Sequence, residues 1–234
     1  MVLLMTLVNR KSAFLCASMC VSIILALLIS HYASANQLSS DNPSKLTVEL
    51  QLFHLAKCGI RPNANSKIQD LFVWHSKETM IKQPYRLLID TLALDIQREP
   101  FLPMSNKLWM CDYEAIEGRG DYVAILNRLE SMTNQALRLS SIEDFIDIKK
   151  KKAWLKFQLK GKTIHWDLTV DDDWLDPKIF ILYDRLLRQS DSKLRIYSNP
   201  VDYGQSAFFA AFTLEQFDCF QNLAPSGLKR IANQ

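Results

Sequence analysis

The chain has 234 residues, of which 48% are hydrophobic and 23% are charged, and its formal net charge is +3. This composition matches an average globular protein, which argues against an intrinsically disordered chain or a multi-spanning membrane protein. From residue 36 onward the chain carries 26 basic and 25 acidic residues, so no electrostatic reason exists to expect a nucleic-acid partner.

The first 35 residues have the pattern of a membrane-targeting segment. Arg10 and Lys11 precede an uncharged run of 18 residues, from Ala13 to Ser30, and the next formal charge is Asp41. The small residues of Ala33-Ser34-Ala35 suit signal peptidase and predict cleavage before Asn36. The run is also just long enough to cross a bilayer, so an uncleaved N-terminal anchor is the alternative. Either interpretation predicts an exported, periplasmic or extracellular protein that meets the membrane only through this segment.

A polar tether follows at residues 36–45, which contain Ser39, Ser40, Asp41, Asn42 and Pro43. Residues 46–234 are then expected to form a single α+β domain, since their number suits one hydrophobic core better than two. Cys58, Cys111 and Cys219 remain after the leader. An oxidising compartment would allow one disulfide and one free thiol, and the spacing does not select the pair.

The first half of this domain is predicted to be helical. Apolar periodicity indicates helices over residues 46–57, 85–94 and 122–132. Gly59 is suited to end the first helix, and Asp121 is expected to be the N-cap of the third.

The second half changes to the alternating period of β-strands. Residues 153–159 and 162–170 alternate apolar and polar side chains around Lys160-Gly161, a two-residue turn typical of a β-hairpin. The register that this turn imposes places Phe157 opposite Ile164 and Leu155 opposite Trp166 on one apolar face.

Further elements follow the hairpin in a second, similar order. Asp176-Pro177 is a typical start for a helix, with Asp176 as N-cap, and an apolar stripe runs from Ile179 to Leu187. Residues 194–198 are expected to form a short strand that ends in a turn at Asn199-Pro200. Strand 206–213 and helix 214–223 complete a ββαββα antiparallel sheet with helices on one face, an α+β fold.

Two groups of acidic residues are candidate chemical sites. Asp112, Glu114 and Asp121 surround a glycine-rich loop and are the candidate catalytic residues, because paired carboxylates bind metals or share acid and base roles. The alternative is a polar loop whose Asp121 caps the next helix. Asp171, Asp173 and Asp176 are the candidate metal ligands, although their spacing lacks the glycine and glutamate of an EF-hand and also suits helix capping. The sequence predicts no cofactor.

Trp154 is the candidate binding residue. Most of the tryptophans occupy positions that suit a hydrophobic core, but Trp154 falls on the polar face of the predicted hairpin. An exposed aromatic side chain there would be available to a partner.

Several short motifs give the chain a resemblance to a group of uncharacterised bacterial single-domain proteins. These are Cys58-Gly59-Ile60, Trp109 with Asp112 and Glu114, Gly120-Asp121-Tyr122, Asp173-Trp174 with Asp176-Pro177, and Gly204-Gln205. The resemblance implies a bacterial protein and supplies no activity. Two functional classes therefore stay open: a non-enzymatic, protein-binding domain similar to immunity or inhibitor proteins, and a carboxylate- or metal-dependent hydrolase.

Overall fold

The computed structural model describes residues 46–231, apart from the side chains of residues 200–203. The predicted leader and tether lie outside these residues, and within them no helix is long and apolar enough to cross a membrane. The elements, in chain order, are α2 (Val48–Lys57), η1 (Ile68–Phe72), α3 (Lys77–Lys82), α4 (Arg86–Leu92), β1 (Leu108–Asp112), α5 (Asp121–Met132), β2 (Ser140–Asp147), β3 (Lys152–Leu159), β4 (Lys162–Leu168), β5 (Val170–Asp171), β6 (Trp174–Leu175), α6 (Lys178–Gln189), β7 (Arg195–Tyr203), β8 (Ser206–Phe212), α7 (Leu214–Leu223) and β9 (Lys229–Arg230).

The predicted α+β class is confirmed, with most helices in the first part of the chain and antiparallel strands dominating the second. The strands form a four-stranded sheet in the order β1-β8-β7-β9, a three-stranded sheet in the order β2-β3-β4, and the small hairpin β5-β6. The predicted order of two strands and a helix occurs twice, as β3-β4-α6 and as β7-β8-α7. The two hairpins do not share one sheet, because β3-β4 belongs to the three-stranded sheet and β7-β8 to the four-stranded sheet.

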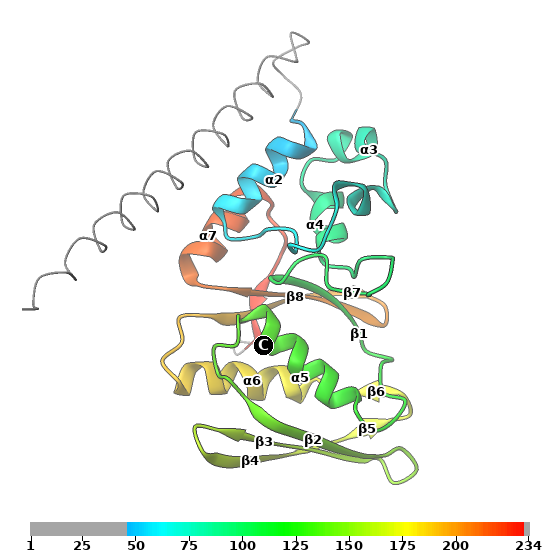
Figure 1. Ribbon diagram of the computed structural model, residues 1–234, viewed down its shortest axis with the longest axis vertical. Coiled ribbons are helices and arrows are strands. Elements are labelled where there is room, and N and C mark those ends of the chain that lie inside the picture. The colour runs from blue at the N-terminus through cyan, green and yellow to red at the C-terminus, as the bar shows by residue number, and fades with distance from the viewer. Residues whose placement is uncertain (1–45, 232–234) are drawn as a thin grey trace, which may run out of the picture. The chain divides into compact units, whose positions relative to one another are not determined.

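The layers of the fold follow from which strand faces are apolar. Figure 1 shows α2, α3, α4 and α7 on one side of the four-stranded sheet, and α5 and α6 between that sheet and the three-stranded one. Strand β8 is buried on both faces, because Phe208 and Phe212 enter one core cluster while Phe209 enters the other. The expected arrangement of helices on one face holds for the three-stranded sheet, whose outer face is mixed polar and aromatic. The four-stranded sheet has helices on both faces.

The β3–β4 hairpin has the predicted register. Phe157 lies opposite Ile164, and Leu155 lies opposite Trp166. At the turn, Lys160 and Gly161 have φ angles of 50° and 76°, the positive values that a primed two-residue hairpin turn requires. The rings of Phe157 and Trp166 pack edge to face with centroids 4.8 Å apart.

The second hairpin turns later than expected. Strand β7 continues through Asn199-Pro200 as far as Tyr203, and the turn lies at Gly204-Gln205. A register shift between Asn199 and Tyr203 accommodates the proline, which cannot donate a ladder hydrogen bond.

The N-terminus of α5 differs from the prediction. Gly120 occupies the N-cap position, while the Asp121 carboxylate accepts hydrogen bonds from the backbone nitrogens of Glu117 and Gly118 at 2.7 and 2.8 Å. The cap is supplied instead by buried Asp144 of β2, which accepts from the nitrogens of Gly120 and Val123. A carboxylate from another sheet thus satisfies the helix donors that Asp121 was expected to satisfy.

A disulfide between Cys58 and Cys219 joins the end of α2 to α7, and Cys111 is a buried free thiol. The pairing links residues that are 161 positions apart, which explains why spacing alone did not reveal it. Because disulfides persist in oxidising compartments, this bond supports an extracytoplasmic location.

Candidate functional site

None of the three predicted catalytic acids lines either of the two cavities described below. Asp112 is exposed at the end of β1 and accepts hydrogen bonds from the Glu114 nitrogen at 3.0 Å and from Gln205 Nε2 at 3.5 Å. Glu114 is exposed and forms a β-bridge with Trp174, and Asp121 is bound to its own loop. These contacts give each acid a local structural role.

Each of the three predicted metal ligands makes a local contact, and the backbone carbonyl of Asp173 accepts a hydrogen bond from the Ile116 nitrogen at 3.0 Å. Asp171 pairs with Lys151, and Asp176 accepts hydrogen bonds from the backbone nitrogens of Thr169 and Lys178. The latter bond caps α6 from one position before its N-cap, Pro177. Among the residues whose side chains the structure describes, no group of three or more potential ligands is suited to a metal.

Trp154 is partly buried on the outer face of the three-stranded sheet, within an aromatic row that crosses all three strands. Its ring centroid lies 5.9 Å from that of Phe145 on β2 and 5.5 Å from that of His165 on β4. An ion pair between Lys156 and Glu143 on the same face, at 2.7 Å, flanks the row. Trp154 therefore contributes to a mixed polar and aromatic surface.

A cavity of about 410 Å³ lies between α4, strands β7 and β8, and the segment after α7. We call it the Asp90 cavity. Apolar side chains dominate its lining, with polar groups at a few positions; its principal residues are Arg86, Ile89, Asp90, Asn199, Phe208 and Leu223. A volume of this size with a few polar groups is typical of a small-molecule site or a side-chain pocket.

The structure fixes the walls of the Asp90 cavity through contacts on both sides. On α4, Leu87, Leu88 and Leu92 are buried in the core, which leaves Arg86 and Asp90, one helical turn apart, to line the cavity. On the other side, Asn199 Nδ2 donates to the carbonyl of Ser226 at 2.8 Å and ties the segment after α7 to β7.

Asp90 differs from the fully buried carboxylates of the domain. Asp70, Glu130, Asp144 and Asp184 are all buried, and each accepts a hydrogen bond. The partly buried Asp90 carboxylate makes no hydrogen bond or ion pair with any residue from 46 to 231. Burial raises its pKa above the ordinary value, and the nearby charges of Arg86 and His75 only partly oppose that shift.

Such a site is suited to a ligand with an apolar body and a positively charged or hydrogen-bond-donating end. Ile89, Phe208 and Leu223 offer apolar contact. The Asp90 carboxylate offers a hydrogen-bond acceptor that no described residue of the protein uses. Sequence reasoning missed this site because its walls come from three distant segments. The available signal was the single charged residue in the mostly apolar stretch from Leu87 to Leu92.

Comparisons of the chain with protein-family models, with curated proteins and with solved structures give no match. No activity, ligand or partner is therefore transferred to it from a relative, and the resemblance to uncharacterised bacterial proteins stays a prediction.

Proposed function

We propose that this protein is an exported, non-enzymatic binding domain that recognises a partner protein through the Asp90 cavity. The partner would insert an apolar side chain accompanied by a Lys or Arg. The observation that carries the proposal is the Asp90 carboxylate, which is partly buried against apolar side chains and has no partner of its own among the described residues.

The energetics favour a cationic ligand. Removing a carboxylate from water without a compensating partner is unfavourable, and the protein shows this cost as a raised pKa of Asp90. A bound ammonium or guanidinium would offset the cost and form a charge-assisted hydrogen bond. Burial of its apolar neighbour against Phe208 and Leu223 would add hydrophobic free energy.

The rival class, a carboxylate- or metal-dependent hydrolase, has less support. Its candidate residues Asp112, Glu114 and Asp121 are held by separate backbone contacts and are not among the residues that line the Asp90 cavity. Among the described residues that line the cavity, Ser226 alone has a hydroxyl side chain. It accepts a hydrogen bond from Gln221 Nε2 at 3.3 Å, which is the setting of a structural serine rather than of an activated nucleophile.

Three probes that share one ring and differ in charge test the site. We expect phenethylamine to shift the NMR resonances of Ile89 and Phe208, phenethyl alcohol to bind more weakly, and phenylacetate to bind least. Asp90→Asn should remove the preference for the amine. Asp218→Asn, which removes the same charge from an exposed position on α7, should retain it. Equal binding of the three probes, or a preference that survives Asp90→Asn, would refute the proposal.

Export itself has a separate test. The charges of Arg10 and Lys11, the apolar run after them and the Cys58–Cys219 disulfide all favour a domain beyond the membrane. A reporter fused after Gln234 should be active only outside the cytoplasm. A mature N-terminus at Asn36 would show cleavage, whereas retention of residues 1–35 would show an anchor; reporter activity inside the cytoplasm would contradict both.

A further inference from the structure

A second cavity has the opposite electrostatic character. It has a volume of about 330 Å³ and lies between the segment after α2, the residues before β1 and the C-terminal end of α5. We call it the Lys107 cavity. Arg61 and Lys107 line it together with the amide or hydroxyl side chains of Asn63, Asn106, Ser131 and Asn134, and none of its described lining residues is acidic.

The two cations of the Lys107 cavity make no ion pair with residues 46–231. Lysines elsewhere on this domain do pair, as Lys77 does with Glu49 and Lys156 with Glu143. Lys107 is partly buried, and this burial lowers the pKa of its ammonium group. Removing an ammonium group from water without a counter-charge is unfavourable, so a bound anion would offset the desolvation free energy of Lys107.

Helix dipoles reduce this positive charge but do not cancel it. Ser131 and Met132 at the C-terminal end of α5 line the cavity, as does Gly59, which directly follows the C-cap of α2, and each helix end carries about half a negative charge. Against them stand two full positive charges, on Arg61 and Lys107. The balance is about one net positive charge, screened further at the more exposed Arg61.

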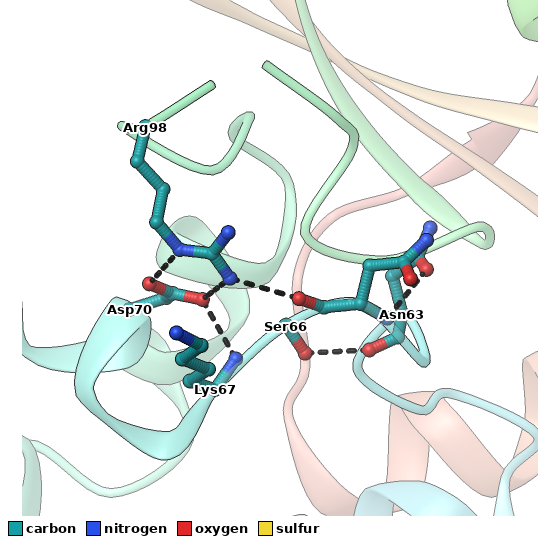
Figure 2. Close-up of polar contacts among 6 residues, drawn as sticks. Asn63, Ser66, Lys67, Asp70 and Arg98 are labelled. Carbon is teal, nitrogen blue, oxygen red and sulfur yellow. Dashed lines mark hydrogen bonds and ion pairs between the residues drawn. The ribbon is translucent and has the colours of Figure 1, made fainter. Parts of the chain in front are cut away.

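The segment that carries Arg61 and Asn63 is held in place before any ligand binds. The nitrogen of Asn63 donates to the carbonyl of Met104 at 2.7 Å, and Ser66 Oγ donates to the carbonyl of Asn63 at 2.6 Å. Figure 2 also shows the Arg98 guanidinium bound to both carboxylate oxygens of Asp70.

The same Arg98 side chain extends these links back to the loop, because its Nη2 donates to the carbonyl of Asn65 at 2.8 Å. A loop fixed in this way presents its polar side chains at little entropic cost to binding.

We propose that the Lys107 cavity binds an anionic, hydroxyl-rich molecule of about the size of one sugar, such as a sugar phosphate or a uronic acid. Lys107 and Arg61 would hold the phosphate or carboxylate group. Asn134, Ser131 and the amide atoms that the 3.2 Å hydrogen bond from Asn63 Nδ2 to Asn106 Oδ1 leaves unused would bind the hydroxyls. This inference is independent of the proposed function, since it uses another cavity and a ligand of opposite charge.

The test is isothermal titration of the purified protein with glucose-6-phosphate, glucuronate, glucose and inorganic phosphate. We expect one of the two anionic sugars to bind at least about tenfold more tightly than glucose or inorganic phosphate, and to weaken with added salt. The tighter of the two identifies the anionic group. Equal affinity for glucose, or inorganic phosphate binding as tightly as both sugars, would overturn the proposal.

Matched variants assign the binding to the cavity. Lys107→Met keeps the apolar stem and removes the charge, and Arg61→Gln does the same at an exposed position. Each substitution should lower the affinity for the anionic sugar by about tenfold or more. Lys82→Met, an exposed lysine at the end of α3, should leave affinity unchanged. Loss of binding in Lys82→Met, or full binding in both cavity variants, would contradict the assignment.

Discussion

The two faces of the four-stranded sheet are stabilised in different ways. On one face, α2, α4 and α7 pack over Phe208 and Phe212 and are joined by the Cys58–Cys219 disulfide. On the other, α5, α6 and the three-stranded sheet form a core around Phe157 and Phe209, and the free Cys111 lies within it. The first side depends on a long-range covalent link and contains the Asp90 cavity, whereas the second relies on side-chain packing.

Removal of the disulfide should have the largest effect. The bond closes a loop of 161 residues, and the chain-entropy model assigns such a loop about 5 kcal/mol of unfolding free energy. Reduction should therefore lower the urea midpoint of the parent protein strongly. The Cys58→Ser, Cys219→Ser double variant should have the low midpoint from the outset and not respond to reductant. A parent midpoint that reductant leaves unchanged would show that the link does not stabilise this face.

Truncation in the packed core of the other face should come next. Phe157 is fully buried against Trp166, and a Phe→Ala change in such a position typically costs about 3 to 5 kcal/mol. Its neighbour Lys156 lies on the outer face and pairs with Glu143, and both side chains are a little under half exposed, so Lys156→Ala should cost at most about 1 kcal/mol. Urea titration of both variants makes the comparison, and equal midpoints for Phe157→Ala and the parent would contradict the buried placement.

The smallest effect should be a pH dependence with opposite signs at two carboxylates of the disulfide-bonded side. Arg98 and the Lys67 nitrogen hold the pKa of Asp70 below its ordinary value, so the folded chain binds this proton less readily than the unfolded chain. The stability from Asp70 is full above the unfolded pKa, about 3.9, and is lost as pH falls through the lower folded value. Burial raises the pKa of Asp90, so the folded chain binds this proton more readily than the unfolded chain. The stability that Asp90 contributes is therefore present at low pH and lost as pH rises through the folded pKa.

Urea midpoints measured between about pH 3 and pH 6 separate the two carboxylates. Asp70→Asn should weaken the fall in stability toward low pH, whereas Asp90→Asn should leave that fall in place and improve stability near neutral pH. Identical pH profiles for the two variants would contradict the pairing of Asp70 and the isolation of Asp90.

The elements that the sequence predicted best are those determined by residues close together in the chain. The β3–β4 register follows from alternation on either side of Lys160-Gly161, and α6 follows from its apolar stripe behind Asp176-Pro177. Strand β2 was not predicted, because its Ser140–Asp147 sequence alternates poorly and gains its place from pairing with β3.

Features that join distant segments could not be predicted, because contacts between such segments leave no local pattern in the sequence. The sequence placed three cysteines in the domain but not the partner of Cys58. It also assigned the cap of α5 to neighbouring Asp121, whereas Asp144, 24 residues from Gly120, makes that contact. The Asp90 cavity combines α4 with β8 and the end of α7, a combination that no local period encodes.

Strand β8 has a consequence for the order of events during synthesis. Leu108 of β1 pairs with Ala210 of β8. Strand β1 therefore leaves the ribosome about a hundred residues before β8 and has no partner strand while the intervening chain is synthesised. Because β8 supplies side chains to both cores, neither core is complete until β8 has been made. A translocation channel accepts an unfolded chain, so a topology that delays completion of both cores is compatible with the proposed export.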